Sequence, residues 1–230
     1  AYTEEQSEEL VYGALKAILE SSPLAEDFDI GLGRIMRRNG DGKAVAIASA
    51  PDSRDGARTT FQVFDETHRL TLASLREAHR TMLANIPKRK AADAWSLEIT
   101  TAPAPGEGSI AEDTMEYARQ VESGKIRDSR LFFYHRQASQ GDKIVKEDGS
   151  IDLEMVRAAV IEASGPVAEW SDIDSIVEQF RDPTADLNYL RRVWCNELVS
   201  SSNRAFNALS WASLARPDYS VDDGEPITLG

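Results

Sequence analysis

Two kinds of apolar spacing alternate along the first 140 residues of this chain. Apolar side chains recur every three or four positions in three segments, which predicts helices with one buried face at Thr3–Glu20, Leu70–Ile86 and Ile110–Val121. Runs rich in β-branched and aromatic residues predict strands at Thr59–Phe64, Trp95–Thr101 and Leu131–His135. Strands alternating with helices are typical of an α/β fold with a mainly parallel sheet, whose ligands gather at the carboxyl ends of the strands.

A β-hairpin is predicted between the first helix and this alternating region. Its strands would be Ile30–Arg37 and Lys43–Ser49, joined by Asn39-Gly40-Asp41-Gly42. Asn-Gly and Asp-Gly pairs supply the positive φ angles that tight hairpin turns require.

The pattern changes after Arg136, where only helical spacing recurs. Helices are predicted at Asp152–Ala163, Ile173–Phe180, Thr184–Leu198 and, more briefly, Phe206–Leu214. We therefore expect a sheet-containing domain over residues 1–140 and a helical subdomain over 141–220. The remaining residues, 221–230, resemble the opening of a further strand.

Composition narrows the class of protein. The 230 residues are 41% hydrophobic, which predicts a folded core rather than a disordered chain. There are 39 acidic against 26 basic side chains, so any contact with nucleic acid must be local rather than made by bulk positive charge. The apolar runs fall far short of the roughly 20 residues that cross a bilayer, and we expect a soluble, cytosolic protein. The single cysteine excludes an internal disulfide framework and a thiolate metal cluster.

Two polar pairs follow predicted strands. Asp65-Glu66 ends the strand Thr59–Phe64, and Thr100-Thr101 ends the next one. An acidic pair in that position suits a nucleotide hydrolase, in which the aspartate binds Mg²⁺ and the glutamate activates the attacking water. Hydroxyls beside it can sense the γ-phosphate. The simpler alternative is that both pairs are ordinary strand ends meeting solvent.

Several segments together resemble one known family. Phe61–His68 resembles the Walker B segment, and Trp95–Pro103 the coupling-motif strand, of the large subunit of tailed-bacteriophage terminases. The opening Ala1–Gln6 looks like the segment that follows the second core strand in those proteins. Asp182-Pro183 and Tyr189–Glu197 are similar to their late helix, in which an Arg-Arg pair precedes an aromatic residue and an asparagine.

The resemblance implies a P-loop ATPase of the additional-strand catalytic-glutamate class with a helical lid or linker, using ATP and Mg²⁺ to pump viral DNA into a capsid. Asp65 would be the Mg²⁺ ligand, Glu66 the catalytic base, and Thr100 and Thr101 the coupling element. A nuclease domain would begin at residues 221–230. The implied partners are double-stranded DNA, a portal protein, a small terminase subunit and further copies in a ring, in the infected bacterial cytoplasm and at the capsid vertex.

The sequence departs from this family pattern in two ways. It holds no G-x-x-x-x-G-K-[ST], the Walker A loop whose amides and lysine cradle the phosphates. Gly42-Lys43 is followed by Ala44 and lies in the predicted hairpin, so it is not such a loop. The nuclease acidic cluster is also missing. The chain therefore looks like the middle of a large terminase, and we expect residues 1–230 alone to bind nucleotide weakly and to hydrolyse almost none.

Three further side chains are candidates for contact with nucleotide. His68 follows the acidic pair directly, and Arg54 and Arg58 precede the Walker B strand in a polar loop. An arginine that reaches a γ-phosphate of a neighbouring subunit lowers the barrier to transfer. The alternative for each is a solvated position. Lys88-Arg89-Lys90 is the densest basic cluster and could touch DNA, although basic residues at the end of a helix usually compensate its dipole.

Two other functions stay open. The chain could be a non-catalytic prophage remnant or docking module that binds partner subunits, or a helicase-like P-loop ATPase. Helicase signatures after the coupling strand would favour the latter, and Leu131–Arg136 carries none. A phosphate loop encoded in frame upstream of Ala1 would favour the packaging motor over the docking module.

Overall fold

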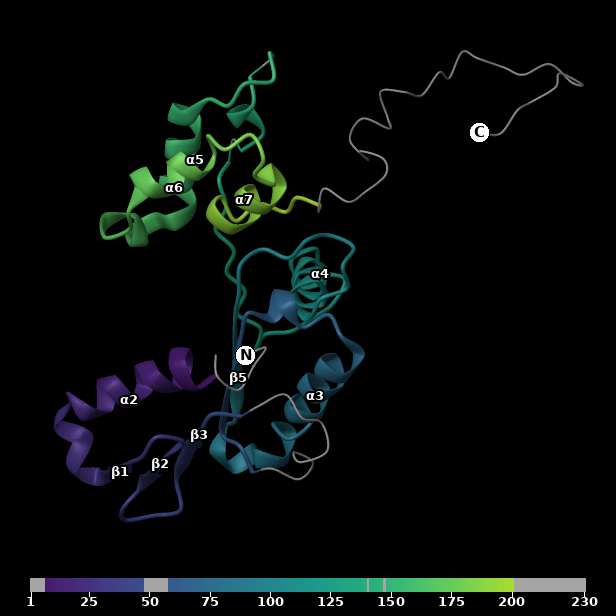
Figure 1. The fold of residues 1–230 in the computed structure, drawn as a ribbon. Coiled ribbons are helices and arrows are strands. Elements are labelled where there is room, and N and C mark those ends of the chain that lie inside the picture. The colour runs from purple at the N-terminus through teal and green to yellow at the C-terminus, as the bar shows by residue number, and fades with distance from the viewer. Residues whose placement is uncertain (1–6, 48–57, 140, 147, 201–230) are drawn as a thin grey trace, which may run out of the picture.

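The computed structural model describes residues 7–47, 58–139, 141–146 and 148–200. It has a strand part, up to about residue 135, and a helical part after it. Figure 1 shows helices α5, α6 and α7 gathered at one end and the strands with α2, α3 and α4 at the other. The fold is α/β, as predicted, with one small parallel sheet and one antiparallel sheet.

The strand part begins with a helix in two segments. A π-helical segment, Ser7–Tyr12, runs into the α-helix α2, Gly13–Glu20. Tyr12 is buried at their junction, and its hydroxyl donates to Gly31 O at 2.9 Å. The described portion confirms the first predicted helix, whereas its capping pair, Thr3 and Gln6, lies outside the described residues.

A three-stranded antiparallel sheet follows the 3₁₀ turn Pro23–Asp27. Its strands in spatial order are β1 (Phe28–Ile30), β2 (Arg34–Arg37) and β3 (Lys43–Val45). The predicted β2–β3 hairpin is confirmed, and Arg37 N donates to Gly42 O across its turn at 2.9 Å.

The prediction that Ile30–Arg37 is one strand was wrong. The chain reverses at Gly31, whose N–H donates to Arg34 O at 2.9 Å, and this turn separates β1 from β2. A Cβ atom at Gly31 would lie 3.0 Å from that same carbonyl oxygen, so a side chain there would crowd the turn. An apolar residue on each side of the turn masked the break in the sequence pattern.

The parallel sheet is a strand–helix–strand unit. Strand β4 (Phe61–Asp65) and strand β5 (Trp95–Ile99) pair side by side, with Asp65 opposite Ile99, and α3 (Ala73–Leu83) connects them. Short 3₁₀ turns, Thr67–Arg69 and Pro87–Ala92, lie before and after α3. This confirms the predicted crossover, although only two of the described strands are parallel, fewer than a mainly parallel sheet implies.

The prediction of a strand at Leu131–His135 was wrong. This segment forms no ladder with any strand in the described part of the chain. Phe132 is 88% exposed and Tyr134 is 68% exposed. A β-strand needs a neighbour for its backbone hydrogen bonds, and aromatic composition alone does not supply one.

Helix α4 (Ile110–Glu122) follows β5 and confirms the third predicted helix. The Ser109 side chain caps it by accepting the Glu112 N–H at 3.2 Å. Ile110 then packs with Leu70 and Leu75 in a small buried cluster, which holds α3 and α4 close to the ends of the two parallel strands.

The helical part contains α5 (Leu153–Ser164), α6 (Ile173–Gln179) and α7 (Leu187–Trp194), with 3₁₀ segments at Gly141–Ile144 and Gly165–Glu169. Aspartates cap all three α-helices, at Asp152, Asp172 and Asp186. The three helices confirm the predicted elements, but α7 is shorter than Thr184–Leu198. The predicted short helix Phe206–Leu214 and the segment 221–230 lie outside the described residues.

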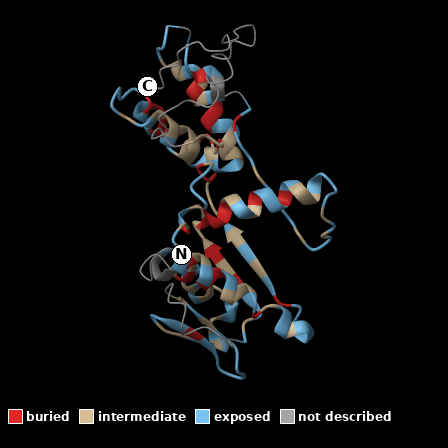
Figure 2. Ribbon diagram, turned by 90° about the vertical axis from the view of Figure 1, so that its right-hand side faces the viewer, coloured by how far each residue is buried: buried red, intermediate tan, exposed pale blue. Residues whose placement is uncertain are grey.

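The helical part has its own core, which is a separate cluster of buried apolar residues. It shares no residue with the cluster of Leu70, Leu75 and Ile110 in the strand part. Figure 2 shows buried residues in both parts of the molecule. The completely buried members are Ile144, Val156, Val160 and Cys195.

Candidate functional site

The predicted polar pairs meet at one edge of the parallel sheet. Asp65 is the last residue of β4, and Thr100 and Thr101 directly follow β5. Because the two strands are parallel neighbours in register, their carboxyl ends lie together, as the sequence predicted. Glu66 N still donates to Ile99 O at 2.8 Å, so the ladder extends one residue past β4.

Glu66 leaves the strand in a left-handed backbone conformation, with φ of 56° and ψ of 45°. Residues other than glycine rarely adopt this region because the Cβ atom crowds the following carbonyl. The turn directs the chain into the 3₁₀ segment Thr67–Arg69 and brings His68 to the end of β5. Backbone strain of this kind is common at functional sites.

His68 is the centre of the site. Its backbone N–H donates to Thr100 Oγ1 at 3.0 Å, and its ring atom Nδ1 lies 2.9 Å from that same oxygen. Nδ1 is also 3.2 Å from Thr101 Oγ1 and 3.3 Å from Glu66 Oε2. We refer to Glu66, His68, Thr100 and Thr101 as the strand-tip cluster.

Burial shifts the protonation of this cluster toward neutral forms. It lowers the pKa of His68 to about 4, helped by the positive charges of Arg69 and Arg192. Burial, together with the negative charge of Asp65, raises the pKa of Glu66, while Arg69 opposes that change. His68 is therefore uncharged at pH 7, and its contact with Glu66 is not an ion pair. Thr100 Oγ1 already accepts the His68 amide, so its hydroxyl proton is free to donate to Nδ1.

Of the other predicted site residues, Arg58 is exposed and lies just before β4, at the opposite end of that strand from the cluster, and Arg54 lies outside the described residues. His68 does not face solvent, the alternative that the sequence left open, because its side chain is only 14% exposed. Thr67 is completely buried beside it, with a hydroxyl that has no hydrogen-bond partner.

The sequence predicted no role for His79, which is buried against β4 and β5. His79 Nε2 lies 3.0 Å from Glu98 Oε1, and the Thr114 hydroxyl donates to Glu98 Oε2 at 2.9 Å. The His79 ring also packs edge-on against Phe64. No sequence signal could have found this contact, because the alternation along β5 would place the apolar Trp95, Leu97 and Ile99 on the covered face, whereas the structure exposes all three and turns Glu98 inward.

Two residues from the helical part also reach the site. Arg192 on α7 is close enough for its charge to lower the pKa of His68. The side chain of Asn196, just beyond α7, accepts the Ala102 N–H at 2.7 Å. Both belong to the segment Tyr189–Glu197, which the family resemblance included without assigning roles to them.

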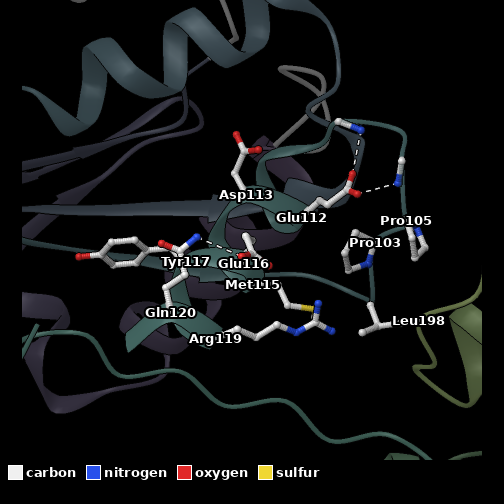
Figure 3. Close-up of a pocket in the computed structure, with 12 residues that line it drawn as sticks. Pro103, Pro105, Glu112, Asp113, Met115, Glu116, Tyr117, Arg119, Gln120 and Leu198 are labelled. Atoms are coloured by element: carbon white, nitrogen blue, oxygen red, sulfur yellow. Dashed lines mark hydrogen bonds between the residues drawn. The ribbon is translucent and has the colours of Figure 1, made fainter. Parts of the chain in front are cut away.

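The loop that follows Thr101 is tied to α4. Glu112 accepts the N–H groups of Gly106 and Gly108 at 2.6 and 2.8 Å, and Figure 3 shows its carboxylate directed back at these two amides. An open groove of about 870 Å³ runs along α4, with Pro103 and Leu198 among its lining residues. The groove lies between α4 and Leu198.

The described residues contain no group of three or more His, Cys, Asp or Glu side chains placed to hold a metal ion. Among the same residues, no helix is long and apolar enough to span a membrane.

Comparisons with known proteins found similarity to a phage protein by sequence and to a phage large terminase by structure. No family model matches the chain. The Gene 13 protein of Mycobacterium phage D29 is 24% identical over 94% of this chain and 40% of its own length. The crystal structure of the HK97 bacteriophage large terminase matches with a TM-score of 0.63, at 14% identity, over 86% of this chain and 38% of that one. The chain thus spans about two fifths of each relative, and its resemblance to the large terminases is confirmed at the level of the fold, which is that of part of a phage large terminase.

Proposed function

We propose that this chain is part of the ATPase motor of a phage large terminase and acts in packaging viral DNA. The observation that carries the proposal is the strand-tip cluster, in which an acidic residue, a neutral histidine and two hydroxyls converge where two parallel strands end. Ligands of open α/β sheets bind at this edge. The fold match supports the same family.

Each residue of the site has a proposed role. Asp65 holds Mg²⁺, whose charge would stabilise the phosphates when the ion is bound. Glu66 is the catalytic base, and the direction of its pKa change suits a proton acceptor near neutral pH. Thr100, Thr101 and His68 form the element that responds to the γ-phosphate. Carboxylate and hydroxyl oxygens are the donors that suit magnesium and its water shell.

The phosphate-binding half of such a site is not encoded in these 230 residues, because they lack a Walker A loop. Backbone amides and a lysine make strong contacts to phosphate. We therefore expect this chain alone to bind ATP weakly and to turn it over negligibly. Glu66-dependent hydrolysis by the isolated chain would contradict that expectation.

The wider assignment follows the same proposal. The catalytic core would be of the P-loop class, with residues 141–220 as lid or linker and 221–230 leading into a nuclease domain that cuts the DNA. Arg54 and Arg58 would serve the active site or that of a neighbouring subunit. The partners would be double-stranded DNA, the portal, a small terminase subunit and further copies in a ring, in the host cytoplasm and at the capsid vertex.

A second candidate is a non-catalytic docking module that binds partner subunits, in which the strand-tip cluster would not be part of a complete triphosphate site. The DNA sequence upstream of Ala1 separates the two candidates. An in-frame G-x-x-x-x-G-K-[ST] supports the motor, and an intact upstream frame without one supports the docking module.

Manganese binding tests the proposed metal ligand in the chain itself. Mn²⁺ replaces Mg²⁺ at oxygen sites and broadens nearby NMR signals, so millimolar Mn²⁺ should broaden His68 and Thr100 first. Asp65→Asn should remove this broadening, whereas Asp41→Asn, in the exposed hairpin turn, should not. Equal broadening in both variants, or none at the strand tips, would contradict the assignment of Asp65.

Turnover tests the proposed base in the protein encoded by the complete reading frame. Glu66→Gln should lower the ATP hydrolysis rate roughly 100-fold or more, since general bases contribute about that much, while nucleotide binding is retained. The matched control is Glu77→Gln, an exposed position on α3. A rate reduced less than about tenfold would remove Glu66 from this role.

A further inference from the structure

We propose that Asn196 is a positioning residue that fastens the end of β5 to the helical part, so that the placement of α7 sets the orientation of Thr100 and Thr101. The inference rests on the proposed function for the meaning of those two hydroxyls. Its structural content, a single side chain linking two parts of the molecule, stands on geometry alone.

Both polar atoms of the Asn196 carboxamide form hydrogen bonds. Its Oδ1 accepts the Ala102 N–H at 2.7 Å, and its Nδ2 donates to Arg136 O at 2.6 Å. Ala102 is buried and directly follows Thr101. Arg136 begins the connection into the helical part. One side chain therefore bridges the strand end, the connection and the end of α7.

The backbone around Asn196 is held firmly to α7. Asn196 has a φ of 51°, a left-handed conformation that asparagine tolerates better than most residues. On one side, the Cys195 N–H donates to Arg191 O on α7 at 3.0 Å. On the other, Glu197 forms a largely buried ion pair with Arg191 at 2.6 Å. A movement of α7 must therefore carry the Asn196 side chain with it.

Among the described residues, the buried clusters of the two parts are separate. An open groove lined by Pro103 and Leu198 lies next to the strand end. Polar links are directional, and when they are removed without replacement a buried amide is left unpaired. The two Asn196 hydrogen bonds therefore couple the position of the β5 end to the position of α7.

Movement of α7 would also change the charge around the strand-tip cluster. Arg192 lies on the same helix and contributes to the lowered pKa of His68. His68 in turn touches both Thr100 and Thr101. A shift of α7 would therefore reach the two hydroxyls by two routes, through the Ala102 amide and through His68.

The test uses the chain as it is, with two NMR readouts at pH 7. Amide exchange at Ala102 reports the bridge, and the ¹⁵N shifts of the His68 ring report which nitrogen carries the proton. Asn196→Gly removes the carboxamide but accepts the positive φ angle. It should speed Ala102 exchange roughly tenfold or more and move the His68 ring shifts. The matched control, Asn188→Ala on α7, should change neither.

A conservative variant separates the two halves of the bridge. Asn196→Asp keeps an acceptor for the Ala102 N–H but cannot donate to Arg136 O. It should keep Ala102 protected and move the His68 shifts less than Asn196→Gly does. If Asn196→Gly fails to fold by circular dichroism, the proposal requires Asn196→Asp to displace the His68 shifts relative to the unsubstituted chain.

Two results would overturn the proposal. One is faster Ala102 exchange with unchanged His68 shifts, which would make Asn196 a structural link only. The other is no change in either readout. Neither readout needs ATP, so an intact bridge in a protein that never hydrolyses ATP would defeat the proposed function and leave this inference standing.

Discussion

Glu66 combines an unusual backbone with an unusual protonation state. Its left-handed conformation costs about 1 kcal/mol or more for a residue with a Cβ atom. Burial and the adjacent Asp65 also disfavour its charged form. Neither feature helps the chain to fold, and residues that retain such costs are common where chemistry is performed. These two properties of a single residue therefore indicate that Glu66 has a functional role.

Replacement of Glu66 by glycine should separate fold from function. Glu66→Gly should leave the free energy of unfolding unchanged or raise it by up to ~1 kcal/mol, because glycine adopts positive φ freely. Glu66→Val should lower it by ~1–2 kcal/mol, since a β-branched residue is strained there. Urea denaturation measures both. A glycine variant that loses more than ~1 kcal/mol would show that the Glu66 side chain stabilises the fold.

His68 should make the fold sensitive to acid. Its folded pKa is about 4 against an ordinary value of 6.5, so between these values the unfolded chain binds a proton that the folded chain does not. Stability is therefore full above pH 6.5 and falls by ~1–3 kcal/mol as the pH approaches 4. The raised pKa of Glu66 has the opposite effect: near pH 4.5 and above, the folded chain binds a proton that the unfolded chain has lost, so the contribution of Glu66 to stability falls as the pH rises.

Denaturation at a series of pH values measures this effect. His68→Gln should flatten the dependence of unfolding free energy on pH between 4 and 6.5. His135→Gln serves as the matched control, because His135 is half-buried at most and stands outside the strand-tip cluster. An unchanged slope in His68→Gln would mean that His68 is not held neutral in the folded chain.

At the scale of elements, helix α5 is the clearest case in which sequence spacing sets burial. Val156, Ala159 and Val160 face the core of the helical part, and Ile161, one position further, is 44% exposed. The Asp152 side chain fixes where the helix begins by accepting the Glu154 and Met155 N–H groups. These hydrogen bonds hold the pKa of Asp152 below its usual value. The start and the buried face of α5 are thus locally encoded.

Shortening a side chain on the buried face of α5 should therefore lower the free energy of unfolding more than shortening one on the exposed face. Val160→Ala should lower the free energy of unfolding of the helical part by about 2 kcal/mol, because Val160 is completely buried and a cavity remains. Ile161→Ala removes more atoms from an exposed position and should cost less than about 1 kcal/mol. Chemical denaturation followed by amide exchange in α5 compares them. Equal losses would contradict this orientation of the helix.

At the scale of the whole molecule, the buried residues of the two parts are connected differently. Among the described residues, ten form one cluster in the helical part, whereas in the strand part Leu70, Leu75 and Ile110 form a cluster and other buried apolar residues, among them Tyr12 and Ile35, lie outside it. Buried apolar area is the main favourable contribution to folding. The helical part should then resist denaturant to higher concentration than the parallel strands.

Hydrogen exchange at increasing urea concentration measures this difference. Peptides from α5 and α6 should stay protected after peptides from β4 and β5 have lost protection. Asn196→Gly should widen the gap, because it removes a link between the parts. A single common transition for all peptides would indicate that the two parts unfold as one unit.

Sequence reasoning succeeded where the determining interactions are local and failed where they are distant. The ends of β4 and β5 were predictable because polar pairs interrupt apolar runs, and their meeting followed from parallel pairing. Leu131–His135 failed as a strand because pairing depends on a neighbour that composition does not specify. Asn196 was missed because its partner Ala102 is 94 positions away. The charge of Arg192 near His68 depends on the same distant packing.

The lone cysteine of the chain sits next to the residue that bridges its two parts. Cys195 is completely buried, and burial raises the pKa of its thiol to about 12, so it is almost unreactive toward alkylating reagents while α7 stays seated. Cys195 belongs to the buried cluster of the helical part, so a reagent reaches its sulfur atom only when α7 lifts away from that cluster. The rate at which a maleimide labels the unmodified protein therefore measures how often α7 opens from the helical core, and mass spectrometry can follow it without an engineered probe.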